Sequence, residues 1–305
     1  MRITETILEK ACTQVEGFAA AYQKLNEKVV LAGQSKSTLN NYARQLAHLC
    51  LHFGCLPEQL DDEQINGYLA ALASGSKSPS LSSFKHSIYG LRFYFRLVGH
   101  PKRAINLPSL KKQDKLPVVL SHQELIRLFN APELIKHRAL LSLVYAGGLR
   151  AGEVCRLKIA DIDSQRMTIF IRQSKGNKDR YVPLSPAILP LLRNYYIACK
   201  PVEWLFNGKE PGQPFSVRGL QWVMGESVKK AHISKQVCVH SLRHSYATHL
   251  LEQGLDLVSI KERLGHAFIQ TTMVYLHVAQ IIPRQIGSPY DELLKKRRDD
   301  KQDKK

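Results

Sequence analysis

An arginine lies on the apolar side of a helical segment in the second half of the chain. In residues 239–250, VHSLRHSYATHL, apolar side chains recur at the helical interval. At about 100° per residue, Arg243 falls between Leu250 and Ala247, inside the apolar arc. A buried guanidinium needs charged partners, because burying it unpaired is strongly unfavourable. From this stretch alone, the simplest interpretation is a structural ion pair with a carboxylate elsewhere in the fold.

Further residues that could do chemistry stand at helix ends and turns. AGGLRAGEV has an arginine past a glycine-broken helix, SKGNK a lysine in a turn, LGH a histidine past a helix terminator, and TTMVYLHV a tyrosine. Each alone fits a surface arginine, a turn lysine or a core tyrosine. Together with HSLRH they supply phosphate clamps, a proton donor and a nucleophile, the groups for phosphoryl transfer without a metal. These residues are Arg150, Lys175, His240, Arg243, His266 and Tyr275.

A zinc site at HSLRH is not expected. His240 and His244 are four residues apart, but the HExxH pattern requires a glutamate where Ser241 stands. Nearby cysteine and carboxylate ligands are missing, and the six cysteines of the chain form no CxxC pair. We therefore expect no metal, no cofactor and no disulfide framework, and the cysteines are expected to be reduced.

Residues 1–100 show helical patterns only. Apolar spacing predicts four helices, which together would form a small bundle. They fall in TETILEKACTQVEGFAAAYQKLNE, in KSTLNNYARQLAHLCLHFG, in DDEQINGYLAALA and in SPSLSSFKHSIYGLRFYFRLVG. Gly54 and Gly99 are the expected terminators of the second and the fourth. Residues 101–117 follow with prolines, basic side chains and no helical period, which predicts an extended basic linker between two domains.

A second domain is predicted over residues 118–280. Ser121 and Glu124 form a capping-box pair before the helical patterns HQELIRLFNA and ELIKHRALLSLVYAGG. Alternating apolar residues in MTIFIRQ and RYVPLS, joined by SKGNKD, predict a β-hairpin over 167–185. Helices are expected again around 186–200, around 216–231 and from 241 almost to the chain end. Within this last part, the expected helix signals are Asp256 as a cap, Gly265 as a terminator and Thr271 or Thr272 as a second cap.

The charge of the chain narrows its partners. Lys and Arg number 44 against 26 Asp and Glu, a formal net charge of +18, and the excess lies in both halves. Such a field favours a polyanion, most simply nucleic acid, although an anionic membrane surface or ribosomal RNA would explain it equally well. No apolar run approaches the ~20 residues that cross a bilayer. Glu5 and Glu9 stand where a secretory signal needs cationic and apolar residues, so the expected location is the cytoplasm.

Four segments carry a resemblance to a known family. GLRAGEV, SKGNKDRYVPL, HSLRHSYATHLLEQG and LGHAFIQTTMVYLHV resemble, in order and spacing, the motifs of the tyrosine recombinase (phage integrase) family, especially its Xer-like and mobile-element members. The resemblance covers nearly the whole chain. It implies a mainly α-helical fold with a small β-sheet: an N-terminal helical core-binding (SAM-like) domain, 1–100, and a mixed α/β catalytic domain, 118–280. A tail, 281–305, would dock on a neighbouring subunit.

The resemblance also implies a role for each residue. Arg150 and Arg243 would bind the non-bridging oxygens of the scissile phosphate, and Lys175 would protonate the leaving 5′-oxygen. The other expected roles are proton acceptor for His240, phosphate contact for His266, nucleophile for Tyr275 and support of the site for Glu153. Tyr275 would form a 3′-phosphotyrosyl intermediate that keeps the bond energy, so neither ATP nor metal is needed. A phenol has a pKa of about 10, so attack at neutral pH needs charge neutralisation and a base.

The expected substrate is double-stranded DNA with specific recombination sites, bound by a homo-tetramer with or without an accessory protein, and no membrane is expected to take part. Two alternatives stay open: a type IB topoisomerase-like relaxing enzyme, and a DNA-binding relative that has lost cleavage. Within the family, the extensions at both ends favour a mobile-element integrase slightly over a resolver of chromosome dimers. The basic residues expected to contact DNA are Lys36, Arg44, Lys77, Lys85, Arg92, Lys111, Lys112 and Lys178.

Overall fold

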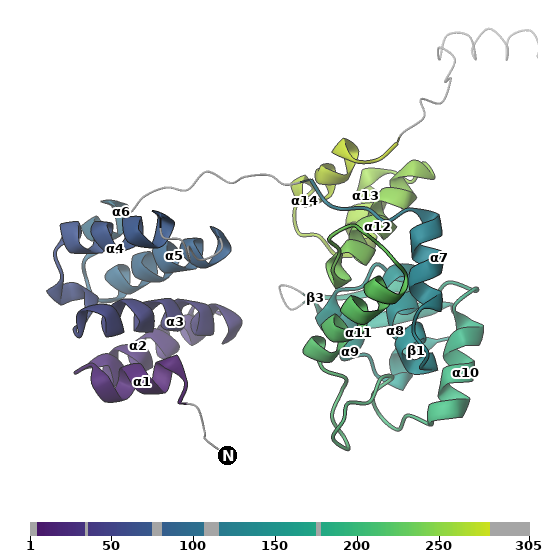
Figure 1. The fold of residues 1–305 in the computed structure, drawn as a ribbon, viewed down its shortest axis with the longest axis horizontal. Helices are drawn as coiled ribbons and strands as arrows, with labels where there is room; N and C mark the ends of the chain where they lie inside the picture. The colour runs from purple at the N-terminus through teal and green to yellow at the C-terminus, as the bar shows by residue number, and fades with distance from the viewer. Residues whose placement is uncertain (1–4, 34–35, 75–80, 107–115, 175–177, 281–305) are drawn as a thin grey trace, which may run out of the picture. The chain divides into compact units, whose positions relative to one another are not determined.

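The computed structural model of the chain describes residues 5–33, 36–74, 81–106, 116–174 and 178–280 (Figure 1). By internal contacts the chain divides into unit 1, Met1–Gln113, and unit 2, Asp114–Lys305. No helix in the described ranges is long and apolar enough to cross a membrane. Several residues named above lie outside them, namely Lys77, Lys111, Lys112, Lys175 and the tail 281–305.

Unit 1 is helical throughout its described residues. Its elements are α1 (Ile7–Gln14), α2 (Phe18–Leu31), α3 (Lys36–Phe53), the 3-10 turn η1 (Pro57–Gln59), α4 (Asp62–Ser74), α5 (Leu81–Leu97) and α6 (Pro101–Asn106). The prediction of one helix over the first segment is wrong, because Gly17 takes a φ of +78° and separates α1 from α2. Gly90 of α5 faces α3: a Cβ on it would lie 3.3 Å from the Cα of Tyr42. This close approach packs α5 against α3.

The prediction of an extended linker from residue 101 is wrong for residues 101–106, which form a helix. Pro101 opens helix α6, a position that proline tolerates because the first N–H groups of a helix have no partner within it. Arg103 of α6 stacks over the Phe95 ring, 4.6 Å from its centroid, and donates from Nε to Asp62 at 2.6 Å. Its Nη2 donates to the carbonyl of Leu60 at 2.8 Å. Arg103 therefore holds α6 against α4 and α5.

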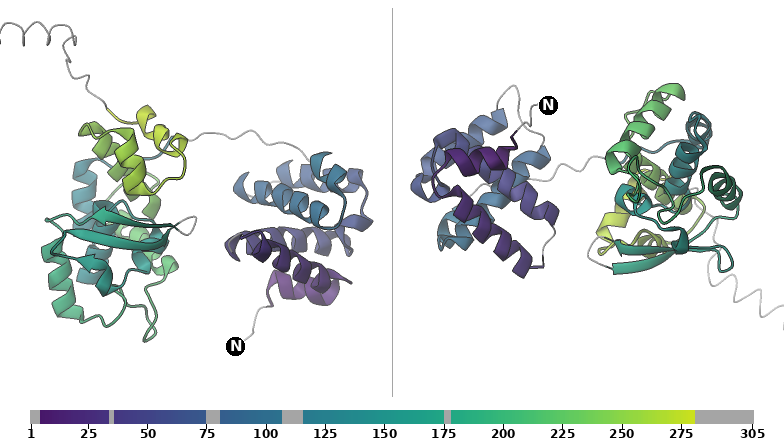
Figure 2. Two further views of the ribbon diagram at one scale, coloured as in Figure 1. Left: turned by 180° about the vertical axis from the view of Figure 1, so that it is seen from behind. Right: turned by 90° about the horizontal axis from the view of Figure 1, so that it is seen from below.

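Unit 2 combines helices with a three-stranded antiparallel sheet (Figures 1 and 2). The predicted hairpin is present, with Ile169 opposite Val182 and the buried side chains of both on the core. A short third strand, β1, pairs with β2 and was not predicted. The elements are α7 (His122–Asn130), α8 (Ile135–Ala146), α9 (Ala151–Cys155), η2 (Ile159–Asp161), β1 (Ile162–Asp163), β2 (Thr168–Ser174), β3 (Lys178–Pro183), α10 (Leu189–Cys199), α11 (Val217–Lys230), α12 (Val239–Glu252), α13 (Leu257–Leu264), α14 (Gln270–Met273) and η3 (Val274–His277).

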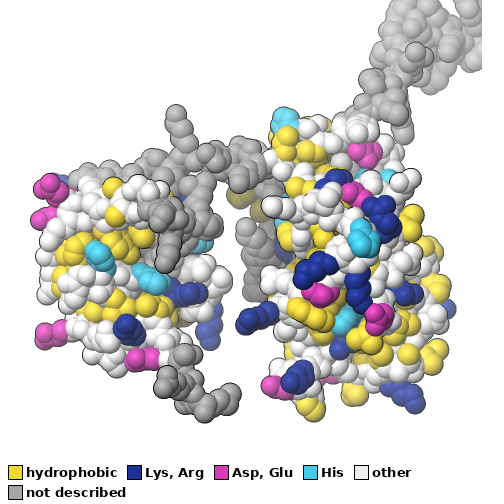
Figure 3. All heavy atoms as spheres, viewed as in Figure 1, with side chains coloured by type: hydrophobic (Ala, Val, Ile, Leu, Met, Phe, Trp, Pro, Cys, Tyr) yellow, Lys and Arg dark blue, Asp and Glu magenta, His cyan; other side chains and the backbone are white. Residues whose placement is uncertain are grey.

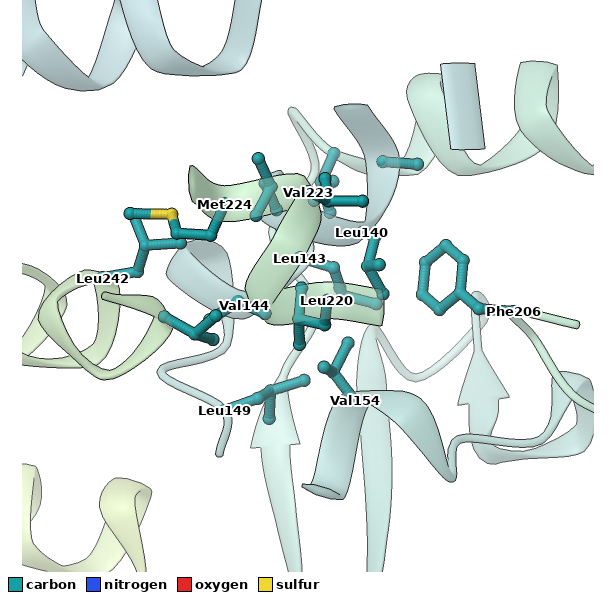
Figure 4. Close-up of a cluster of buried hydrophobic side chains, with 14 of the residues drawn as sticks. Leu140, Leu143, Val144, Leu149, Val154, Phe206, Leu220, Val223, Met224 and Leu242 are labelled. Atoms are coloured by element: carbon teal, nitrogen blue, oxygen red, sulfur yellow. The ribbon is translucent and has the colours of Figure 1, made fainter. Parts of the chain in front are cut away.

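Helix α8 is the centre of the unit 2 core. Its side chains are buried on several sides because α7, α9, α10, α11 and α12 all pack against it. Figure 4 shows this cluster, with Leu140, Leu143 and Val144 of α8 between side chains of α9, α11 and α12. The helix ends at Ala146 with Gly147 as its C-cap, and Gly148 takes a φ of +58°. The two glycines end α8, and the chain leaves the core and continues to Arg150.

Helices α12 and α13 and the short α14 and η3 turns lie together at one end of unit 2 (Figure 1). The predicted signals at α13 are confirmed, because Asp256 accepts from two backbone N–H groups and Gly265 ends the helix at φ +62°. The predicted threonine cap is wrong: Ile269 precedes α14, and Thr272 is buried inside it. The capping box of Ser121 is confirmed. The fold class is as expected, mainly helical with a small sheet.

Candidate active site

Arg243 is buried, with 1% of its surface exposed, as its place on the apolar arc predicted. Its Nη1 donates to the carbonyl of Gly148 and its Nη2 to the carbonyl of Leu264, both at 2.6 Å. The simplest interpretation of the sequence, an ion pair with a carboxylate, is therefore wrong. Burial and the nearby cations Arg150 and Arg180 lower the pKa of Arg243 to about 9, which still leaves it charged at neutral pH. The two carbonyls fix its orientation without neutralising it.

Arg150 reaches the same place from the loop after α8. It precedes α9, and its Nη2 lies 3.3 Å from the carbonyl oxygen of Gly265. Leu264 and Gly265 are consecutive, so the guanidinium groups of Arg150 and Arg243 contact neighbouring carbonyls at the end of α13. The sequence separates these two arginines by more than ninety positions, and the fold brings them together beside His266. Two adjacent cations at one helix end form a site for an anion.

Glu153 holds Arg150 in position. It is buried, and its Oε1 accepts from Arg150 Nη1 at 2.7 Å while its Oε2 accepts from the Arg150 backbone N–H at 2.9 Å. It also binds Arg180 of β3 through both oxygens, at 2.9 and 2.8 Å. Arg180 Nε in turn lies 3.2 Å from the carbonyl of Arg263. Glu153 therefore links α9, β3 and the end of α13.

Two of the predicted histidines lie near the arginines. His266 follows the left-handed Gly265, and its Nδ1 lies 2.9 Å from the Oγ1 of Thr272. Burial, then the positive charges of Arg243 and Arg150, lower the pKa of His266 to about 3, so it is neutral at pH 7. Burial and the same two arginines also lower the pKa of His240. Both imidazoles can therefore act as neutral donors or acceptors beside a phosphate.

Tyr275 lies in the η3 turn with 1% of its surface exposed. Burial raises the pKa of its phenol, while Arg243 and Arg150 act in the opposite direction. Its Oη lies 3.2 Å from the Nδ1 of His244, on the helix that also carries His240. The family resemblance implied His240 as the acceptor of the tyrosine proton, whereas the hydrogen bond in the structure goes to His244.

The structure assembles only part of the predicted set. Lys175 lies outside the described residues, between β2 and β3, whose ends pair at Ser174 and Lys178. Among the predicted DNA contacts, Lys36 and Arg44 are exposed on α3, whereas Lys85 and Arg92 are half-buried on α5, all four in unit 1. Figure 3 shows Lys and Arg side chains over the visible face of unit 2, with His, Asp and Glu side chains among them.

Sequence reasoning missed two residues of the site, Arg180 and His244. Arg180 stands two positions before Val182 on β3, so the period of two places it on the buried face of the strand. A charged residue on that face is the same signal that marked Arg243. His244 was weighed only as a zinc ligand, and its proximity to Tyr275 depends on tertiary packing that the sequence does not show.

The fold and this site agree with comparisons to known proteins. Residues 118–281 match the model of the phage integrase family, and residues 22–102 match that of the phage integrase N-terminal SAM-like domain. The chain belongs to the phage integrase family, the tyrosine recombinases.

Relatives and solved structures of this family cover most of the chain. It is 39% identical over 279 residues to a putative integrase/recombinase of Sinorhizobium fredii. The match covers 89% of this chain and 88% of that protein. It is 33% identical to the tyrosine recombinase XerD of Staphylococcus epidermidis, over 84% of this chain and 92% of that one. A XerH site-specific recombinase bound to a palindromic difH substrate matches with a TM-score of 0.67 at 22% identity, over 90% of each chain. A lambda integrase dimer bound to a core site matches at 0.69 and 18%, over 88% of this chain and 80% of that one. These two structures share the fold.

Proposed function

We propose that this tyrosine recombinase cuts and rejoins double-stranded DNA at specific sites, with Tyr275 as the nucleophile. The observation that carries the proposal is the convergence of two arginines at the end of α13, beside His266 and within electrostatic reach of Tyr275. A phosphodiester carries one negative charge and two non-bridging oxygens. Two fixed guanidinium groups match that charge and geometry, and they stabilise the extra charge that develops on attack.

The roles of the other groups follow from their chemistry. Attack of the Tyr275 oxygen on phosphorus forms a 3′-phosphotyrosyl bond and breaks the bond to the 5′-oxygen. Lys175, between β2 and β3 in the sequence, protonates that leaving oxygen. A histidine of α12 takes the tyrosine proton, and His266 contacts the phosphate. Glu153 and Arg180 hold Arg150 in place and are positioning residues.

The two central side chains of the site are buried. Arg243 and Tyr275 are both 1% exposed, so a phosphate reaches them only after the surrounding elements shift. The elements that carry Thr272 and Tyr275, α14 and η3, are each four residues long. Short elements with few internal hydrogen bonds open at a small cost compared with global unfolding. We therefore place the opening step in α14 and η3, on binding DNA.

Unit 1 supplies further DNA contacts in this proposal, through Lys36, Arg44, Lys85 and Arg92. The reaction requires two sites brought together, so we propose a homo-tetramer on DNA, with or without an accessory protein. We place it in the cytoplasm, where bacterial and archaeal DNA lies. The net charge of +18 supports a polyanionic partner.

Covalent capture tests the function. The protein and a Tyr275→Phe control are incubated without metal with fragmented DNA of the source organism, denatured, and the attached DNA is sequenced. Capture that needs Tyr275 and maps to one or a few sites supports a recombinase. Capture spread over many sequences, with relaxation of supercoiled DNA lacking those sites, would support a relaxing enzyme instead. Tight DNA binding without capture by either protein would contradict both.

A further inference from the structure

The phenol of Tyr275 has a defined hydrogen-bond partner. His244 lies one helical turn after His240 on α12, and its Nδ1 is 3.2 Å from Tyr275 Oη. The two rings are 5.7 Å apart and tilted by 58°. Helix α12 packs against the η3 turn, and this packing brings the two side chains together. A base must lie within hydrogen-bond reach of the proton it removes, and His244 meets that requirement.

We propose that His244 is the catalytic base that accepts the proton of Tyr275, an inference that rests on the proposed recombinase function. The O–H bond of Tyr275 breaks and its proton moves to Nδ1 of His244 while the Oη–phosphorus bond forms. The bond from phosphorus to the 5′-oxygen breaks, and that oxygen takes a proton from Lys175. On rejoining, the 5′-hydroxyl attacks phosphorus and gives its proton to Lys175, and His244 returns its proton to Oη.

The charge state of His244 agrees with this role. Burial, then the neighbouring His240 and Arg243, lower its pKa to about 4, so the imidazole is neutral at pH 7 and can accept a proton. From η3 the titratable group that faces it is Tyr275, whose pKa is raised by burial. The proton therefore stays on the phenol in the free protein. It moves as the Oη–phosphorus bond forms, because the phenol oxygen then gives up electron density to phosphorus and its proton becomes far more acidic.

His240 occupies a different part of the site. Its ring is perpendicular to that of His244 at 4.5 Å, and it is the more exposed of the two. Arg243 lowers the pKa of both histidines, and Arg150 also lowers that of His240. His244 is hydrogen-bonded to Tyr275, whereas His240 has more of its surface open to a bound phosphate. The geometry points to a phosphate contact for His240 and proton acceptance for His244.

The pH dependence of cleavage tests this assignment. The rate of covalent complex formation is measured in single turnover, from pH 6.5 to 9, on an oligonucleotide carrying the captured site. In His244→Asn the amide can keep a hydrogen bond to Oη but cannot take its proton. We expect this variant to be at least about a hundredfold slower at pH 7. Its rate should rise about tenfold per pH unit, because solvent must then deprotonate the phenol. His240→Asn should be slower than wild type but should keep the wild-type pH profile.

A second substrate separates the base from the acid. With sulfur in place of the bridging 5′-oxygen, the leaving group needs no proton, so Lys175→Ala should recover most of the wild-type rate and His244→Asn should not. His244→Gln serves as a second variant, and matched urea midpoints show that each variant folds. The proposal is overturned if His244→Asn cleaves at the wild-type rate, or if His240→Asn acquires the pH dependence instead. If wild-type protein forms no covalent complex while the variants bind DNA normally, the recombinase function fails first, and the role of His244 with it.

Discussion

Glu153 and Arg180 form a two-point ion pair, with Nη1–Oε1 at 2.9 Å and Nη2–Oε2 at 2.8 Å, and only 4% and 10% of their side chains are exposed. The same carboxylate binds Arg150. Glu153 thus neutralises part of the positive charge next to Arg243 and fixes the direction of the arginine that is proposed to bind the phosphate. Its removal affects stability and catalysis together.

Glu153→Ala is expected to lower the free energy of unfolding of unit 2 by about 3–5 kcal/mol, because it leaves buried guanidinium groups without their partner. Urea denaturation followed by tryptophan fluorescence measures this directly, since both tryptophans of the chain, Trp204 and Trp222, lie in unit 2. The control is Glu226→Ala, which removes an exposed pair with Lys229. An exposed pair contributes at most about 1 kcal/mol. Equal losses in the two variants would contradict the supporting role of Glu153.

Arg180→Lys separates positioning from stability. An ammonium group cannot reach both oxygens of Glu153 as the planar guanidinium does, so Arg150 becomes less well fixed. We expect covalent complex formation to slow about tenfold or more while DNA affinity stays within about twofold. Single-turnover cleavage and fluorescence anisotropy measure the two quantities on one DNA. A loss of affinity without a loss of rate would assign Arg180 to DNA binding.

Gly148 is a tightly packed glycine that binds Arg243 through its backbone carbonyl. Its carbonyl accepts from Arg243, its φ is +58°, and a Cβ on it would lie 2.4 Å from the Tyr246 ring. Gly148→Ala therefore carries the left-handed penalty of about 1–2 kcal/mol and a steric cost of about 1–3 kcal/mol more. The control is Gly212→Ala, which has φ +73° and nothing within 4 Å of its Cβ. The difference between their urea midpoints measures the steric part, and equal midpoints would show that the ring moves aside freely.

Parts of this site could be predicted from the sequence, and the parts that could not share a physical reason. The burial of Arg243, the cap at Asp256 and the pairing of β2 with β3 depend on local periodicity and turn chemistry, which neighbouring residues determine. The partners of Arg243 are the backbone carbonyls of Gly148 and Leu264. Every residue has a backbone carbonyl, so residue types in the sequence do not indicate which ones accept from Arg243. The expectation that Arg150 and Arg243 bind one phosphate came from the resemblance to the family, because local sequence patterns do not show which distant residues meet.

Tertiary contacts decided the points where the sequence misled. Helix α6 forms in the predicted linker because its Arg103 contacts residues earlier in the chain. It binds Asp62, more than forty residues earlier, and stacks on Phe95, eight residues earlier. The proton partner of Tyr275 changes from His240 to His244 through one turn of α12, a difference set by how η3 packs on the helix. Periodicity places both histidines on α12 but does not say which of them faces another element.

The stability of unit 2 should depend on pH through its neutral histidines. The pKa of His244 is lowered to about 4 and that of His266 to about 3. An unfolded histidine titrates near 6.5, so below that pH the unfolded state binds protons that the native state does not. The stability contribution of these groups is therefore fully present above pH 6.5 and is lost as the pH falls toward 4. Urea midpoints by tryptophan fluorescence should fall from pH 7 to pH 5, and less steeply in His266→Asn. An unchanged slope would show that His266 is protonated in the native protein.

Unit 1 should contribute to DNA affinity through its basic side chains. Each Lys or Arg that contacts a phosphate releases counterions, so removal of one such contact lowers the slope of log affinity against log salt by about one. Arg44→Ala on α3 and Lys85→Ala on α5 are expected to do so, measured by anisotropy from 50 to 300 mM salt (roughly the range where the effect is large). Lys10→Ala, on the exposed surface of α1 and outside the predicted set, is the matched control. A smaller slope in all three would indicate a general effect of net charge, and only a change confined to Arg44 and Lys85 supports direct phosphate contacts.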